Sequence, residues 1–303
     1  PQQGYLTVFA TRPGATKVEV TIGAKGKVKM APQLNIPLNA GQKATFSLQQ
    51  FDVLNLEAYS TLTGLAVATM TGTRIVADKP VAVFGGHEEL VQGYDKGPED
   101  GCCAEHVEEQ LLPLQAWGTK AVCPKTKPRG VEPDIWVVMA GKDGVTLKTT
   151  PSISGLDGKV LAKAGDWVEV ETTQSFVVEG DGKIQVGQFI VSQQQTDDWI
   201  GDPTFIIHPP ANQMREDYFI LTPVGYTKNY GSVVRPKGLT ITLDGKAVDN
   251  SLFSAIGSGV WELAYVDLQP GMHSLEAEQA FGLSVYGYGN ATAYGYPGGM
   301  NLK

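Results

Sequence analysis

The sequence predicts an all-β protein built from three tandem homologous antiparallel β-sandwich-like units that pack together, and two observations lead to this prediction. The first is composition: the 303 residues include 36 Gly and 18 Pro, 42% of residues are apolar and only 18% are charged. Such a mixture is typical of many short strands joined by turns, because helix-forming residues are never concentrated for long. The second is an alternation of apolar and polar residues that recurs about every hundred residues.

Each copy of this pattern has an alternating strand, then a glycine-containing turn that leads into another strand, and then a closing pair of strands. The alternating strands are expected at 16–23, 143–150 and 237–246. The turns with their strands lie at 39–48, 163–172 and 257–266. The closing pairs begin at Gly72, Gln174 and Met272. Glycine before an alternating run supplies the positive φ of a turn, so units with about seven short strands are expected, as in antiparallel sandwiches.

The predicted organisation is three β units separated by two connectors. The units span 4–96, 134–193 and 218–299. The first connector, 97–133, holds an acidic loop and the one expected short helix, at 103–118. The apolar residues of this expected helix lie on one side and leave a polar face on the other, and its proline should bend or end the helix. The second connector, 194–217, is rich in proline. Long Gly/Ser linkers are absent, which favours shared interfaces between the units.

Charge excludes several classes of function. The formal net charge is −8, and between His87 and Gln110 there are eight acidic residues against one basic residue. Nucleic-acid binding needs clustered Lys and Arg, so no nucleic-acid partner is expected. No apolar run reaches the roughly 18 to 20 residues of a membrane helix, so no membrane span is predicted in this chain. The sequence begins at Pro1, which we interpret as a processed or trimmed end; a missing signal peptide therefore says nothing about secretion.

The segment "EDGCCAEHVEEQ" at 99–110 contains two of the three cysteines. A disulfide between Cys123 and either Cys102 or Cys103 would close a loop of about twenty residues and stabilise the fold by roughly 3 kcal/mol. The odd cysteine would then be a buried thiol or an intermolecular link.

The same segment could carry a metal or a nucleophile instead. A zinc site would draw on His87, His106, Cys103 and Cys123, but adjacent cysteines rarely bind one tetrahedral ion and no CxxC is present. The acids at 94–101 lack the order of a known calcium loop. Cys103 and His106 could pair for nucleophilic catalysis, yet the acidic surroundings would raise the thiol pKa. Without any catalytic motif, the sequence predicts no cofactor, no bound metal and no enzymatic activity.

The candidate binding residues lie at two places. His87 and Glu88 follow a strand and a glycine pair, and four tyrosines alternate with small residues in "VYGYGNATAYGYPGG" near the end. Tyrosines are enriched at recognition surfaces, so this segment could form an aromatic contact face for glycans or proteins. The interpretation we favour is that they pack into the last unit, where glycines allow close approach. The four tyrosines are Tyr286, Tyr288, Tyr294 and Tyr296.

Several segments together resemble a known family. In order they are "VAVFGGHE", "CAEHVEEQLLPLQAWG", "GDPTFIIHPPANQ", "YFILTPVGY" and "VYGYGNATAYGYPGG". Their order and spacing, from Tyr5 to Gly299, resemble the N-terminal domain family of IgG-Fc-binding proteins. Cys103 falls at the family's cysteine, His106 at about its histidine, and Trp117-Gly118 at its Trp-Gly. Glu89 stands where the family commonly has a further cysteine, so the disulfide partner stays open.

The resemblance implies an extracellular or cell-surface module in oxidising surroundings, which favours a disulfide, and it offers no catalytic residue to carry over. We therefore expect a non-catalytic binding or adhesion module that recognises a protein or a glycan. The alternative is a structural subunit of a filament or coat that self-associates. A secreted hydrolase is a third possibility.

Overall fold

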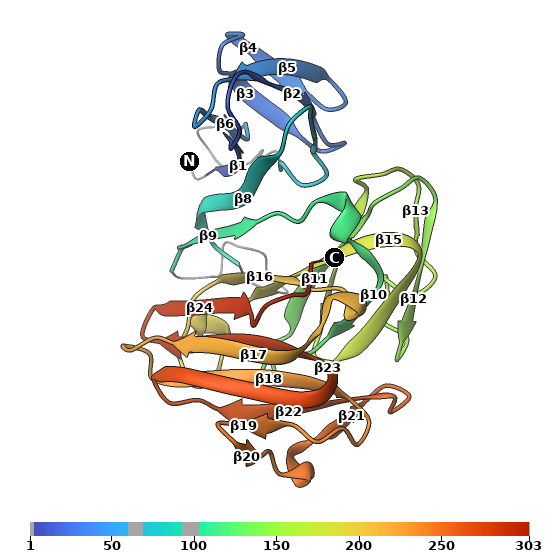
Figure 1. Ribbon diagram of the computed structural model, residues 1–303, viewed down its shortest axis with the longest axis vertical. Coiled ribbons are helices and arrows are strands. Elements are labelled where there is room, and N and C mark those ends of the chain that lie inside the picture. Colours follow the sequence, from blue (N-terminus) through green and yellow to red (C-terminus); the bar gives the residue numbers. More distant parts are fainter. Residues whose placement is uncertain (1–2, 60–68, 93–102, 303) are drawn as a thin grey trace.

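The computed structural model describes residues 3–59, 69–92 and 103–302, and antiparallel β-sheet dominates this part of the chain (Figure 1). The all-β prediction is confirmed. Helical structure among the described residues is limited to single turns of 3₁₀ helix, three residues each. These turns are η2 (Leu114–Ala116), η3 (Gln193–Gln195), η4 (Ala211–Gln213) and η5 (Asn250–Leu252).

The first unit, at the top of Figure 1, has a four-stranded sheet in the order β6-β1-β8-β9 and a three-stranded sheet in the order β5-β2-β7. A hairpin, β3-β4, accompanies them. A hydrophobic cluster that includes Val8, Val20, Phe46 and Leu56 forms its core. The strands are β1 (Gly4–Ala10), β2 (Thr16–Thr21), β3 (Lys27–Ala31), β4 (Ile36–Asn39), β5 (Lys43–Leu48), β6 (Val53–Glu57), β7 (Arg74–Ala77), β8 (Val81–Leu90) and β9 (Glu105–Gln110).

The second unit is organised around one long strand, β15, and its core includes Trp136, Leu156 and Phe176. The N-terminal half of β15 pairs with β10 and β12, and its C-terminal half pairs with β11 and β16. The strands are β10 (Gly118–Cys123), β11 (Asp134–Ala140), β12 (Val145–Thr150), β13 (Val160–Leu161), β14 (Trp167–Thr172), β15 (Phe176–Ile190) and β16 (Thr204–His208).

The third unit repeats this plan around the long strand β23, with Phe281 and Leu283 in its core. The N-terminal half of β23 pairs with β17 and β19, and its C-terminal half pairs with β18 and β24. The strands are β17 (Arg215–Thr222), β18 (Lys228–Pro236), β19 (Thr242–Leu243), β20 (Lys246–Ala247), β21 (Ser254–Ile256), β22 (Trp261–Asp267), β23 (Gly271–Gly289) and β24 (Thr292–Pro297).

The same row of four strands occurs in all three units: β6-β1-β8-β9, β14-β11-β15-β16 and β22-β18-β23-β24. In the second and third units the central strand continues into the other layer, whereas in the first unit β7 and β8 are separate strands with Pro80 between them. Proline lacks the N–H that a continuous ladder needs, which explains the break. Homology of the three units remains a prediction, and this shared order supports it.

The helix expected at 103–118 is wrong. Residues 105–110 form strand β9, which pairs with β8, and a single 3₁₀ turn follows at 114–116. Val107 is buried while His106 and Glu108 are exposed, so burial alternates with the period of a strand. As a strand, this segment forms backbone hydrogen bonds with the edge of β8. A short helix in the same place would leave the N–H and C=O groups on that edge unpaired.

The segments expected as connectors contribute strands to the sheets. β9 and β10 come from 97–133, and β16 and the start of β17 come from 194–217. The boundaries of the units remain predictions. The strand order favours shorter connectors, at 111–117 between β9 and β10 and at 209–214 between β16 and β17.

The second and third units share a hydrophobic interface, as the prediction of packed units requires. One cluster joins Val122 and Val177 to Met214, Val234 and Leu263. Another cluster is largely aromatic, and it consists of Ile190, Ile206, Tyr230, Tyr286 and Tyr288. Burial of this much apolar surface couples the two units energetically.

Candidate functional site

His87 and His106 lie on neighbouring strands of the first unit, β8 and β9, and the Tyr5 side chain from β1 reaches across β8 at Gly86 to β9. The Tyr5 hydroxyl donates a hydrogen bond to Glu108 Oε2 at 2.7 Å and lies 3.3 Å from His106 Nε2. The His106 ring stacks on the Tyr5 ring with 6.0 Å between centroids. Burial lowers the pKa of His87, and its Nδ1 accepts a hydrogen bond from the Glu89 backbone. Glu88 beside it is exposed.

The predicted zinc alternative is not assembled. Among the described residues no three His, Cys, Asp or Glu side chains are placed to hold a metal ion together. Cys123 is fully buried in the apolar core of the second unit, and burial raises the pKa of its thiol well above the ordinary value. A thiol held neutral in this way is a poor metal ligand.

The disulfide prediction is corrected in one respect. Cys103 is disulfide-bonded, whereas Cys123 is a free thiol, so neither of the two predicted pairings of Cys123, with Cys102 or with Cys103, is formed. Cys102, the other candidate, lies outside the described residues. The bonded state of Cys103 also removes the thiol that a Cys103–His106 nucleophile pair would need.

Tyr286 and Tyr288 do not form a contact face. Both are fully buried between the second and third units, because the second unit covers the side of β23 that an isolated sheet would leave to solvent. The Tyr286 hydroxyl accepts a hydrogen bond from the Lys127 backbone at 2.8 Å. Tyr294 and Tyr296 are half-buried, and Tyr296 donates to the backbone oxygen of Leu221. Tyr294 and Tyr296 pack against the core of the third unit, as the favoured interpretation expected, whereas Tyr286 and Tyr288 pack at its interface with the second unit.

Three acidic groups lie where β9 meets β16. Glu109 accepts a 3.4 Å hydrogen bond from the backbone of Ile207, and burial raises the pKa of its carboxyl to about 7. Asp202 is only 2% exposed, its Oδ1 has no hydrogen-bond partner, and burial together with Glu105 raises its pKa to about 6. This acidic seam joins the first unit to the second.

Motif segments that are distant in sequence contact each other in two places. A side chain added at Gly118 would lie 2.5 Å from Pro210, so the Trp-Gly and Pro-Pro motifs are in contact. The backbone of Gly201 donates to that of Gly289 at 2.7 Å, which joins Gly-Asp-Pro to the tyrosine-rich end. Both contacts lie close to the boundaries between units.

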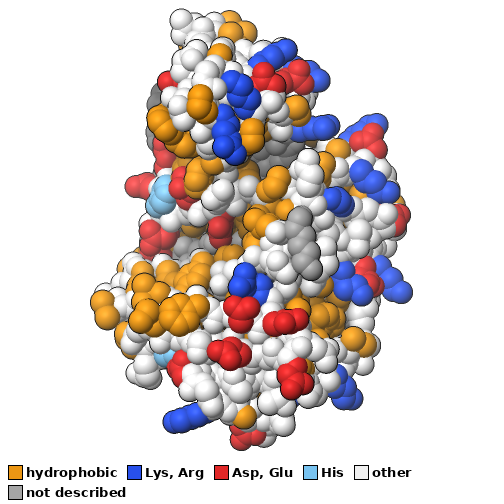
Figure 2. Space-filling view, in the orientation of Figure 1, with side chains coloured by type: hydrophobic (Ala, Val, Ile, Leu, Met, Phe, Trp, Pro, Cys, Tyr) orange, Lys and Arg blue, Asp and Glu red, His pale blue; other side chains and the backbone are white. Residues whose placement is uncertain are grey.

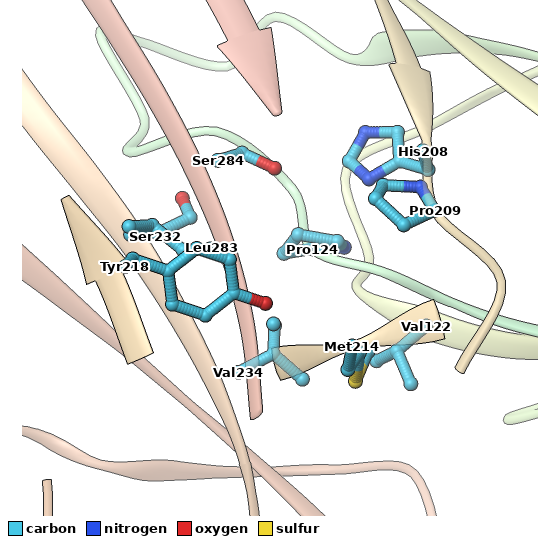
Figure 3. Close-up of a pocket in the computed structure, with 11 residues that line it drawn as sticks. Val122, Pro124, His208, Pro209, Met214, Tyr218, Ser232, Val234, Leu283 and Ser284 are labelled. Carbon is cyan, nitrogen blue, oxygen red and sulfur yellow. The ribbon is translucent and has the colours of Figure 1, made fainter. Parts of the chain in front are cut away.

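A small cavity lies between the second and third units (Figure 3). Tyr218, Ser232 and Ser284 lie on one side of it, and His208 with Pro209 lies on the other. Its volume of about 20 Å³ admits one water molecule, which is too little for an organic ligand. Burial lowers the pKa of His208 to about 4, so this histidine is neutral at physiological pH.

Exposed apolar side chains gather on β17 and beside it, where the sequence predicted no binding residue. Phe219 is 72% exposed and Leu221 is 62% exposed, and Met272, opposite Leu221 on β23, is 69% exposed. Val224 follows β17 in the next turn and is 79% exposed. We call these four residues the β17 patch. Figure 2 shows hydrophobic side chains gathered over the region of β17 and β24.

A signal for this patch was present in the sequence. The run "YFILT" at 218–222 is apolar at successive positions, whereas a strand with one solvated face should alternate. The inward residues Tyr218 and Ile220 enter the core, and the other two apolar side chains therefore face outward.

The family model described as IgGFc binding protein matches residues 1–287. This chain belongs to the IgGFc binding protein family. A human relative, IgGFc-binding protein, is 26% identical over 291 residues, which cover 94% of this chain but only 5% of that protein. The chain thus spans a small fraction of its relative.

Among solved structures, an anti-sigma factor domain-containing protein aligns with 55% of this chain and 77% of its own, at 12% identity and a TM-score of 0.16. A TM-score of that size carries no argument about fold or function. In the part of the chain that is described, no helix of this IgGFc binding family member is long and apolar enough to cross a membrane.

Proposed function

We propose that this chain is a non-catalytic extracellular protein-binding module and that the β17 patch is its contact surface. Membership of the IgGFc binding protein family supports a protein partner. The disulfide at Cys103 supports an oxidising, extracellular compartment, since such bonds are rare in the cytosol.

The observation that carries the proposal is the exposure of large apolar side chains on an edge strand. β17 pairs with β23 alone among the described strands, and Phe219 and Leu221 point away from the core. Aromatic and long aliphatic side chains are enriched at the centre of protein interfaces. A contiguous exposed apolar surface on a folded domain is the usual mark of a binding site.

The patch favours a protein over a glycan. Glycan recognition uses aromatic rings together with hydrogen-bonding side chains, whereas the four patch residues provide apolar surface without side-chain donors. The chain's formal charge of −8 again disfavours nucleic acid.

The experiment compares binding by the intact chain and by a F219D/L221D double variant. Immobilised IgG Fc is the first probe, because the human relative is named IgGFc-binding protein. Immobilised Fab fragments serve as the control. Val160→Asp is the matched variant: Val160 is 57% exposed but lies on β13 of the second unit. We expect Phe219→Asp with Leu221→Asp to reduce binding at least about tenfold, and Val160→Asp to leave it unchanged.

Light scattering on the same samples tests self-association. A dimer that dissociates in the double variant would assign the β17 patch to contacts between copies, as in a filament or coat. A monomer that binds Fc equally well with and without the patch would contradict the proposed contact surface. A monomer that binds no Fc would move the search to other extracellular proteins and remove Fc as the ligand of this chain.

A further inference from the structure

Three charged side chains lie buried together at the start of β11. Lys125 Nζ lies 2.9 Å from Asp134 Oδ1 and 3.5 Å from Glu132 Oε1. The side chain of Lys125 is 3% exposed, and those of Glu132 and Asp134 are 1% exposed. Ordinary ion pairs lie at the surface, where water stabilises both charges. Here an amine and two carboxyl groups are brought together almost without solvent.

The protein holds the Asp134 carboxyl firmly in place. Its Oδ2 accepts hydrogen bonds from the Thr126 backbone at 2.7 Å and from Gln188 Nε2, and its Oδ1 accepts one from Thr126 Oγ1 at 2.9 Å. Lys125 is held as well, since Tyr265 donates a hydrogen bond to its backbone oxygen at 2.8 Å. The amine and the carboxyl group are therefore positioned before any reaction.

Glu132 has a free oxygen in this site. Its Oε1 accepts a hydrogen bond from the Arg129 backbone at 2.9 Å, while its buried Oε2 has no hydrogen-bond partner. An unpaired buried carboxylate oxygen is costly, and it is open to a hydrogen-bond donor or a proton. Glu132 is therefore placed to take a proton from the nearby ammonium group and to pass it on.

We propose that Lys125 and Asp134 become joined by an intramolecular isopeptide bond and that Glu132 transfers the protons. The Lys125 ammonium gives one proton to Glu132, and the neutral Nζ then attacks Cγ of Asp134. The hydrogen bonds from Gln188 and the Thr126 backbone stabilise the oxyanion that develops on Oδ2.

The bond is completed by loss of water. Oδ1 leaves as it receives the proton held by Glu132 and the second proton released by Nζ, and the carbonyl re-forms on Oδ2. One ammonium and one carboxylate thus become one amide and one water molecule, with no oxidant or other reactant. Condensation is favoured because it replaces two buried charges by a neutral group, and burial of charges is what makes this site costly.

The test is the mass of the intact, purified wild-type chain after full reduction and denaturation. We expect a mass lower than the sequence mass by one water molecule. Several Asp-Gly pairs in this chain could also lose water by forming a succinimide, so the site must be located. Tryptic digestion should yield a branched peptide made of residues 121–129 and 130–142, because modified Lys125 resists cleavage and Lys127 precedes a proline.

Two variants distinguish the proposed bond from other losses of water. Lys125→Arg cannot form the amide but leaves every Asp-Gly pair intact, and Glu132→Gln keeps the shape of the side chain but cannot accept the proton. Both should have their full sequence mass and give only linear peptides. A wild-type chain of full mass, with cleavage after Lys125 and a linear 130–142 peptide, would overturn the proposal. This result does not depend on whether either variant folds.

Discussion

Gly86 shows how one residue determines the geometry around the two histidines. It lies on β8 opposite Glu108, and the Tyr5 side chain covers the space where its side chain would stand. An added Cβ would lie 2.6 Å from the Tyr5 hydroxyl and would clash with the backbone oxygen of Val107. Glycine is needed here for close approach of a ring.

Gly86→Ala should therefore destabilise the fold. We expect a loss of about 1 to 3 kcal/mol, the usual cost of overpacking, measured by urea denaturation. Gly4→Ala is the matched control on the paired strand, since the nearest atoms to its added Cβ would lie 3.7 Å away, an ordinary contact. Equal stability of the two variants would show that the Tyr5 ring and the β9 backbone at Val107 both move aside without cost.

For single residues, the sequence identified candidate side chains more accurately than it predicted how deeply they are buried. His87 and Glu88 lie on β8 next to His106 on β9, although His106 was expected on a helix, and the tyrosines were open to two interpretations. Tyr286 and Tyr288 lie in a stretch of β23 that is buried on both faces. Alternation cannot reveal such a strand, because the second face is covered by a different unit of the chain. The β17 patch was missed because an exposed apolar residue resembles a core residue in sequence.

Strand β9 carries the acidic contact between the first and second units. Glu109 faces Ile207 on β16, while Glu105 of the same strand faces Asp202. Burial raises the pKa of Glu109 to about 7, so the folded state binds a proton that the unfolded chain releases between about pH 4.5 and 7. Stability contributed by this group is therefore present at low pH and is lost as pH rises towards 7.

Glu109→Gln should remove this dependence. We expect the variant to be more stable than the wild type at pH 8, by on the order of 1 to 3 kcal/mol, and nearly equal to it at pH 5. Urea denaturation at the two pH values measures both differences. Glu108→Gln is the control on the exposed face of β9, although it also weakens the bond from Tyr5. A stability difference at pH 5 as large as at pH 8 would contradict titration of Glu109.

The element scale also explains the error over residues 103–118. Leu111, Leu112 and Leu114 gave the segment a helix-like clustering of apolar residues, but they follow the strand and belong to the crossing into the second unit. The segment became a strand because it pairs with the edge of β8. Most of the paired residues on β8 lie more than twenty residues earlier in the sequence than their partners on β9. The periodicity of a segment does not show whether an unpaired strand edge lies beside it in the folded protein.

Across the whole molecule, the three units are joined unequally. The second and third share two hydrophobic clusters. The first unit's cluster contains only its own residues and those of the adjoining crossing. All five tryptophans lie at or after Trp117, so none belongs to the first unit's core, and Trp167 lies under Lys25 of that unit.

Two unfolding transitions are therefore expected in urea. Far-ultraviolet circular dichroism should show both, whereas tryptophan fluorescence should follow mainly the later transition of the second and third units. Tyr286→Phe assigns that transition: it removes the acceptor of the Lys127 N–H and the partner of Ser232, at a cost of about 1 to 3 kcal/mol. Coincident curves from both probes would show that the first unit is coupled as strongly as the others.

The all-β class was predictable from composition and alternation, since both depend on local sequence, and the packing of units was predicted from the absence of long Gly/Ser linkers. The corresponding strands were only partly matched: 163–172 and 257–266 include β14 and β22, which pair with β11 and β18, but 39–48 includes β5, which pairs with β2. The counterpart in the first row is β6. An alternating strand looks alike in either layer of a sandwich, and pairing alone separates them.

The first and second units also meet where Gly72 and Gly165 face each other, each at positive φ and with no room for a Cβ. The contact is between backbone atoms. A substitution on one side therefore cannot be compensated by a change of side-chain size or charge on the other. Methods that infer contacts from correlated substitutions need positions that vary together. This contact would therefore leave no such record, and its two glycines would look like unrelated turn residues in any set of related sequences.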